Sequence, residues 1–121
     1  MEHEKLDQLG PIVKRIRAFN ESRDWAQFHN PKDLAISLSL EAAELLEHFQ
    51  WKSGEEMKAH LANQKSEVAA ELADVFYWVL LISDYFGIDP IEALTAKMDQ
   101  NEVKYPTGKA KGNHAKYTEL T

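Results

Sequence analysis

The sequence contains no cysteine, which excludes disulfides, thiolate chemistry and zinc sites built on cysteine. Long apolar runs are also missing: the longest, VFYWVLLI at 75–82, is far shorter than the roughly 20 residues that span a bilayer. The first ten residues, MEHEKLDQLG, have neither the basic start nor the apolar core of a signal peptide. We therefore expect a cytoplasmic protein with no membrane contact.

Basic residues are outnumbered, with 14 Lys and Arg against 20 Asp and Glu and a net charge of −6. A protein that binds nucleic acid would show a basic face, so we expect no nucleic-acid partner. An acidic protein can still bind a small polyphosphate if divalent metal ions lie between the two sets of negative charges. The 121 residues are enough for one domain with its own hydrophobic core.

Apolar residues recur at helical spacing along most of the chain, and no segment alternates with the period of a strand. The spacing predicts helices at about 4–22, 32–50, from about 54, 65–86 and 90–104. A capping box at Ser53–Glu56, a stop at Gly87 and a start at Asp89-Pro90 separate the later helices. We expect an all-α, four-helix-bundle-like domain over residues 1–105 and a polar tail over 106–121.

Four acidic residues occur in two pairs on these predicted helices. Glu41 and Glu44 are three residues apart and share a helix face, and Glu71 and Asp74 repeat the spacing on the long helix. Their neighbours are mostly apolar, and burying ionised carboxylates costs several kcal/mol each unless something compensates. Metal ions are the natural compensation. Ligands that are all oxygen favour a hard cation, Mg²⁺ or Mn²⁺, over zinc.

Other interpretations of the acid pairs are weaker. A single Glu-x-x-Glu on a helix is usually a solvated face, but two pairs on apolar helices at one spacing favour a site. A di-iron carboxylate bundle would need Glu-x-x-His on two helices. Neither pair has a histidine at that position, and His48 lies four residues after Glu44. We therefore predict a magnesium or manganese site.

Aromatic residues form a second group. Trp25, Phe28 and His29 lie before the second predicted helix, Trp51 lies at its end, and Trp78 follows Asp74 by about one turn. Flat rings beside a phosphate-binding metal site could stack a nucleobase. The alternative is that these rings belong to the core or to an interface.

The end of the last predicted helix carries polar residues that suit phosphate. Lys97, Asn101 and Lys104 follow helical spacing, and Tyr105 comes next. They could reach phosphate oxygens, although lysines on a helix surface are often only solvated.

These features together resemble the MazG-like nucleotide pyrophosphohydrolase superfamily, and within it the dCTP pyrophosphatase branch. The matching segments are RDWAQFHNPKDLAISLSLEAAELLEHFQW (23–51), ELADVFYW (71–78), KMDQNEVKYP (97–106) and KYTEL (116–120). The family's mark is an E-x-x-E pair followed, after a variable gap, by E-x-x-D. Alone this pattern is weak, but joined to D-W-x-x-F-H-x-P and F-Q-W it is specific.

The resemblance implies hydrolysis of a nucleoside triphosphate, dCTP or a related pyrimidine nucleotide, to the monophosphate and pyrophosphate. It also implies that the four acids are magnesium ligands and that Trp25, His29 and Trp51 line the nucleoside pocket. Two positions depart from the relatives: Trp78 stands where they place a tyrosine, and Ile16 where some carry a histidine.

The resemblance further implies a homodimer or a homotetramer built as a dimer of dimers, with sites shared between subunits. From the chemistry, a carboxylate not fully committed to metal would take the proton of the attacking water, and Glu44 and Glu47 are both candidates. The competing function is a non-catalytic helical module that binds a nucleotide or a protein partner, because apolar helices and aromatics would also suit an interface.

Overall fold

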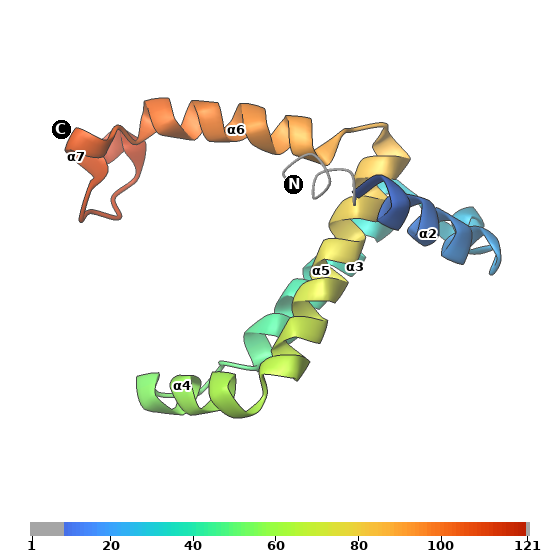
Figure 1. Cartoon of the computed structure of the whole chain (residues 1–121), viewed down its shortest axis with the longest axis horizontal. Helices are drawn as coiled ribbons and strands as arrows, with labels where there is room; N and C mark the ends of the chain where they lie inside the picture. Colours follow the sequence, from blue (N-terminus) through green and yellow to red (C-terminus); the bar gives the residue numbers. More distant parts are fainter. Residues whose placement is uncertain (1–8, 121) are drawn as a thin grey trace. The chain divides into compact units, whose positions relative to one another are not determined.

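The computed structural model describes residues 9–120 and confirms the all-α class (Figure 1). The helices are α2 (Leu9–Glu21), η1 (Trp25–Phe28), α3 (Pro31–Glu47), α4 (Gly54–Asn63), α5 (Lys65–Phe86), α6 (Pro90–Lys104), α7 (Thr107–Ala110) and η2 (Tyr117–Glu119). No strand occurs among the described residues, and none of their helices is long and apolar enough to cross a membrane. The predicted start of the first helix near residue 4 lies outside the described part of the chain.

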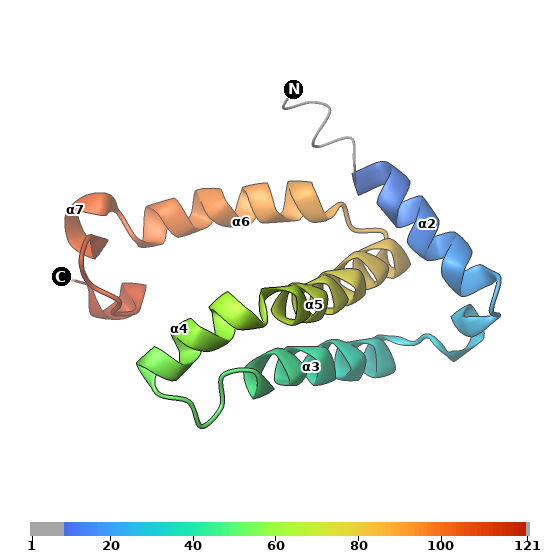
Figure 2. The ribbon, with the colours of Figure 1, turned by 60° about the horizontal axis from the view of Figure 1, so that its bottom comes forward.

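The chain divides into two compact units, Met1–Gly87 and Ile88–Thr121. In the first unit, α3 and α5 lie side by side and run in opposite directions, with α4 at the turn between them (Figures 1 and 2). Helix α2 packs against α5, and η1 connects α2 to the start of α3. The pair α3–α5 is therefore the frame of the first unit.

The predicted helix start and stop signals are present. Ser53 accepts the Glu56 N–H and Glu56 reaches back to the Ser53 N–H, which completes the capping box of α4. Helix α5 ends at Gly87, whose φ of 68° lies in the left-handed region that glycine adopts freely. Asp89 accepts the N–H groups of Ile91 and Glu92 at the start of α6. Each of these signals depends only on neighbouring residues, and each places a helix boundary where the sequence predicted it.

Helix α3 ends earlier than predicted, at Glu47 and not near residue 50. The next residues form a tighter turn, in which the Phe49 N–H bonds to the Leu46 carbonyl at 2.9 Å. Trp51 then has a φ of 70°, so the backbone is left-handed there and the helix cannot continue. Trp51 consequently lies beyond the helix and not at its last turn.

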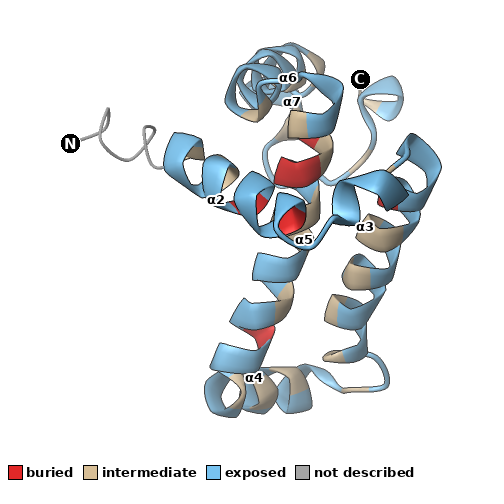
Figure 3. Cartoon of the chain, turned by 90° about the vertical axis from the view of Figure 1, so that its right-hand side faces the viewer, coloured by how far each residue is buried: buried red, intermediate tan, exposed pale blue. Residues whose placement is uncertain are grey.

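The main cluster of buried apolar residues lies at one end of the α3–α5 pair, and Val68 near the start of α5 is buried apart from it (Figure 3). Ile16, Leu34, Leu80 and Leu81 pack together in this cluster, from α2, the start of α3 and the end of α5. Arg17 of α2 also pairs with Asp84 of α5, with its Nε 3.1 Å from Asp84 Oδ2, and this hydrogen bond lowers the pKa of Asp84.

Large apolar side chains remain exposed along the middle of the same helices. Leu40 of α3 is 60% exposed, and Leu72 and Phe76 of α5 are 52% and 51% exposed. Most of the surface of α3 and α5 is correspondingly coloured as exposed in Figure 3. Large exposed apolar patches on a protein commonly mark interaction surfaces.

The second unit holds the segment 106–121, predicted to be a polar tail. It contains the short helices α7 and η2. The Lys104 ammonium lies 4.8 Å from the centre of the Tyr117 ring, and the Tyr105 ring meets Tyr117 edge-on. The tail is thus held to the end of α6 by these contacts, and its boundary at residue 106 stays a prediction.

Leu34 tests the core directly, because its side chain is only 1% exposed. We expect Leu34→Ala to lower the free energy of unfolding by about 2–5 kcal/mol, through lost burial and the cavity left behind. Urea denaturation followed by far-UV circular dichroism measures this. The control Val103→Ala, at a position 80% exposed, should change stability by less than about 0.5 kcal/mol; equal losses in both variants would contradict this placement of the core.

Candidate functional site

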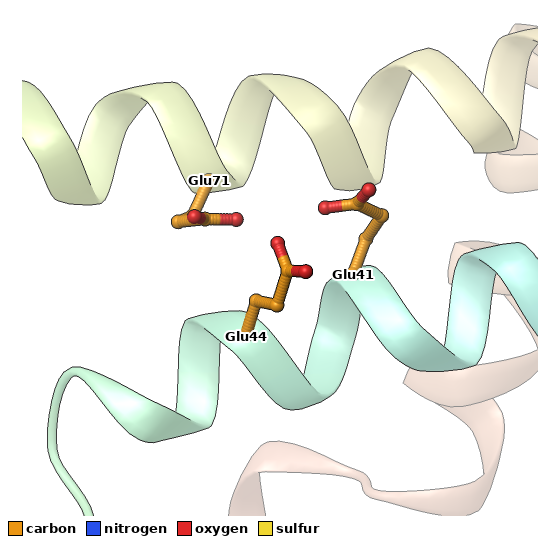
Figure 4. Close-up of side chains that lie close together, drawn as sticks. All are labelled: Glu41, Glu44 and Glu71. Carbon is orange, nitrogen blue, oxygen red and sulfur yellow. The ribbon is translucent and has the colours of Figure 1, made fainter.

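Three of the four predicted acids meet between α3 and α5. Glu41 and Glu44 project from α3 and Glu71 projects from α5, and one carboxylate oxygen of each lies within 4.8 Å of the others (Figure 4). The spacing of three residues sets Glu41 and Glu44 on one face of α3, and the antiparallel pairing brings Glu71 opposite them.

The burial of two carboxylate oxygens in this cluster is not compensated by hydrogen bonds. Glu41 Oε2 and Glu71 Oε2 are buried, and neither has a hydrogen-bond partner. Burial is the largest cause that raises the pKa of Glu41 and of Glu71, and the nearby Glu44 and Asp74 carboxylates raise both pKa values further. An all-oxygen donor set with two orphaned buried oxygens fits a hard divalent cation, which would pair with both.

The fourth predicted ligand, Asp74, lies beside the cluster. It is exposed on α5 and does not belong to the three-carboxylate group, yet its charge contributes to the raised pKa of Glu41 and of Glu71. Asp74 and Glu41 both line the larger aromatic cavity described next. Asp74 therefore lines that cavity beside a member of the carboxylate cluster.

The aromatic cavity, of about 460 Å³, lies against α2, α3 and α5. Glu41 and Asp74 line it together with Trp25 and Trp78. A second cavity of about 380 Å³ shares Trp25 and Trp78. Volumes of this size suit a small-molecule ligand. The structure thus brings two of the predicted acids and two predicted tryptophans to one cavity.

Other predicted residues lie around this place. Phe28 and His29 line the second cavity with the two tryptophans. Glu47, the alternative proton acceptor, lines a polar cavity of about 330 Å³ with Glu44, His48 and Glu71. Glu44 and Glu47 therefore share this cavity, but only Glu44 also belongs to the three-carboxylate cluster.

Local backbone geometry explains the position of Trp25. Asp24 has a φ of 54°, a left-handed conformation that Asp tolerates better than most residues, and it turns the chain from α2 into η1. The Trp25 ring then meets Phe19 edge-on at 5.4 Å between ring centres, and Trp78 meets Tyr77 in the same way at 5.2 Å. Edge-to-face contacts of this kind hold the cavity wall in place.

Five predicted substrate-binding residues lie outside these cavities. Trp51 is 91% exposed. Lys97, Asn101, Lys104 and Tyr105 belong to the second unit, where Lys104 and Tyr105 contact Tyr117. Their roles stay predictions.

Sequence reasoning missed four residues of the larger cavity: Ile12, Arg15, Phe19 and Tyr77. Tyr77 follows Asp74 by three residues, so helical spacing already places it on the acid-bearing face of α5. Arg15 and Phe19 are four residues apart and share a face of α2, but only the crossing of α2 over α5 brings that face to the cavity.

The chain belongs to the MazG-like family, whose model matches residues 36–120. It is 36% identical over 111 residues to mouse dCTP pyrophosphatase 1 and 35% identical to the human protein of that name. Each alignment covers 89% of this chain but 65% of the relative, so the chain spans slightly less than two thirds of their length.

A solved structure agrees with this family assignment. The crystal structure of a pyrophosphatase from Archaeoglobus fulgidus is similar, with a TM-score of 0.78 and 45% sequence identity. The match covers 82% of this chain and 93% of the archaeal chain. The shared fold therefore includes nearly all of that protein.

The raised pKa values of Glu41 and Glu71 predict how the metal-free protein responds to pH. An acid whose pKa is higher in the folded state than in the unfolded state lowers the stability of the fold at pH values above the folded-state pKa. This loss of stability shrinks as the pH decreases toward 4.5, the ordinary pKa of a glutamate. In EDTA, we expect Glu41→Gln to melt at a higher temperature than the unmodified protein at about pH 7.5, with the gap closing toward about pH 5.

Differential scanning fluorimetry across this pH range makes the measurement. Glu55→Gln on α4 is the matched control and should follow the unmodified protein at every pH. A gap that stays constant with pH, or one that widens toward acid, would contradict the assigned electrostatics.

Proposed function

We propose that this chain is a Mg²⁺- or Mn²⁺-dependent hydrolase that cleaves a nucleoside triphosphate to the monophosphate and pyrophosphate. The observation that carries the proposal is the cluster of Glu41, Glu44 and Glu71, with two buried oxygens lacking partners, beside a cavity walled by two tryptophans. Membership of the MazG-like family and relatives named dCTP pyrophosphatase and pyrophosphatase support the reaction class.

The four acids would hold the metal. Glu41, Glu44 and Glu71 offer converging oxygens, and Asp74 faces the cavity next to Glu41. Bound Mg²⁺ or Mn²⁺ would supply charge neutralisation for the polyphosphate and Lewis acidity. The protein's part is to fix the donors on two rigid helices, so that little reorganisation is needed when the substrate enters.

The nucleoside would occupy the space between Trp25 and Trp78, where an aromatic base can stack. Phe28 and His29 extend this wall in the adjoining cavity. The names of the vertebrate relatives favour dCTP or a related pyrimidine deoxynucleotide as the substrate.

Hydrolysis requires a proton acceptor. Water adds to phosphorus as the bond to the leaving pyrophosphate breaks, and one proton of the water must pass to a base. Glu44 and Glu47 line one polar cavity, and we propose that one of them accepts this proton.

We also propose that a second copy covers the exposed apolar face of α3 and α5, as a homodimer or a dimer of dimers. Leu40, Leu72 and Phe76 are all more than half exposed, and the cluster of Ile16, Leu34, Leu80 and Leu81 covers only one end of the helix pair. A self-association that buries this face would remove the apolar surface from water.

The exposed face also favours a second candidate, a non-catalytic module that binds a nucleotide or a protein partner. Turnover separates the two candidates, because a binding module would release no product.

Product analysis tests the hydrolase. With Mg²⁺ and each dNTP and NTP in turn, we expect a nucleoside monophosphate and pyrophosphate, with the highest kcat/KM for a pyrimidine deoxynucleotide. Glu41→Gln and Asp74→Asn should each reduce kcat/KM by more than about 100-fold. The control Glu67→Gln, exposed on the same helix as Asp74, should stay within about twofold of the unmodified enzyme.

Release of orthophosphate, or no turnover with any nucleotide, would overturn the proposed reaction. Full activity in Glu41→Gln would instead overturn the metal assignment. Glu47→Gln identifies the proton acceptor: a large loss of kcat with unchanged Mg²⁺ dependence selects Glu47, and full activity selects Glu44.

The interface has its own test. We expect analytical ultracentrifugation to show at least two copies per particle, and Leu40→Lys to shift the population toward the monomer because a buried lysine is costly. Val103→Lys, at an exposed position on α6, is the control and should leave the mass unchanged. A monomeric unmodified protein would contradict the proposed association.

A further inference from the structure

Asn20 is a buried polar residue outside the cavity lining. Its side chain, on α2, is only 3% exposed, although most positions that pack one helix against another are apolar. A buried amide is tolerated only when its hydrogen bonds are made. Asn20 Nδ2 lies 2.9 Å from the Ile16 carbonyl oxygen and 2.9 Å from the Tyr77 hydroxyl oxygen.

The Ile16 carbonyl determines which way this amide faces. A carbonyl oxygen can only accept, so the Asn20 atom that it contacts must be the nitrogen. The second N–H of that nitrogen is then directed at the Tyr77 hydroxyl oxygen, which accepts it. The Tyr77 hydroxyl oxygen therefore accepts a hydrogen bond from Asn20.

The proton of the Tyr77 hydroxyl has only a weak hydrogen-bond acceptor. Its contact back to Asn20 Oδ1 is 3.3 Å, at the long end for an O–H donor, and it competes for the same amide that already donates to the hydroxyl. A better acceptor nearby would take this proton. Tyr77 lines the 460 Å³ cavity, between edge-on contacts to Phe19 and Trp78.

We propose that Asn20 is a positioning residue which orients Tyr77 so that its hydroxyl donates a hydrogen bond to an acceptor on the nucleobase, such as a pyrimidine ring carbonyl. This inference rests on the proposed function for the identity of the ligand. The Asn20–Tyr77 pair acts on base recognition and not on the reacting phosphorus, because the carboxylates that would hold the metal ion at the phosphates are other side chains of α3 and α5.

Two single variants and their combination test the pair. Tyr77→Phe removes only the hydroxyl, and Asn20→Leu replaces the amide by an apolar group of similar size. For each we expect KM for dCTP to rise about 3- to 10-fold, which corresponds to the loss of one hydrogen bond to the ligand. We expect kcat to change by less than about twofold. The double variant should be no worse than Tyr77→Phe alone, because Asn20 acts only through that hydroxyl.

Ser83→Ala is the matched control. Ser83 is also a buried polar residue on α5, its hydroxyl donates to the Val79 carbonyl at 2.8 Å, and it does not line the cavity. We expect this variant to change the melting temperature but not KM. Binding of dCMP, followed by the fluorescence of Trp25 and Trp78, supplies a second readout that needs no turnover.

The outcomes separate this inference from the proposed function. If the unmodified protein hydrolyses dCTP but Tyr77→Phe leaves KM and dCMP affinity unchanged, the inference is wrong and the function stands. The same holds if Asn20→Leu only lowers the melting temperature, or if the two effects on KM multiply. If no nucleotide is hydrolysed, the function fails, and dCMP affinity alone decides the inference; absence of dCMP binding overturns it as well. Should Asn20→Leu not fold, Tyr77→Phe decides.

Discussion

The arrangement of like charges between α3 and α5 is the constraint on which the rest of the structure depends. Glu41, Glu44 and Glu71 converge, and two of their oxygens are buried without partners, so the charges repel and are poorly solvated. Packing that serves only stability would separate such groups or place a cation among them. The raised pKa values of Glu41 and Glu71 express the same cost. A divalent cation would remove the conflict, which is why we propose that the cluster is a metal-binding site and not only a structural feature.

Because of this repulsion, different parts of the first unit stabilise the fold and form the carboxylate cluster. Two helices that repel at their acidic positions must be held together elsewhere, and the buried core of Ile16, Leu34, Leu80 and Leu81 does so at one end of the pair. Helix α2 contributes to that core, is joined to α5 through Arg17 and Asp84, and carries part of the aromatic wall. One helix thus stabilises the frame and also closes the cavity, so changes in its packing should affect both stability and ligand binding.

Much of the fold followed from short-range signals in the sequence. Three helix boundaries depend on only a few neighbouring residues: the capping box at Ser53, the glycine stop at Gly87 and the start at Asp89-Pro90. Because such local signals can be read from the sequence, these boundaries were predicted closely. The end of α3 was predicted too late, because a tryptophan gives no local sign of the left-handed backbone found at Trp51. Likewise the apolar spacing that predicted the first helix did not single out Phe19 as a cavity residue, whereas the structure places it in the cavity wall.

The sequence by itself determined the acid pairs, since a separation of three residues on any helix puts two side chains on one face. It also determined the all-α class and, through the motifs around Trp25 and Trp51, the MazG-like resemblance. Only the tertiary structure decided that Glu71 lies opposite Glu41 and Glu44 while Asp74 stands toward the cavity, and that Asn20 reaches Tyr77 from another helix. These relations depend on how α2, α3 and α5 pack, and helical periodicity determines which face a residue occupies but not which other helix that face meets.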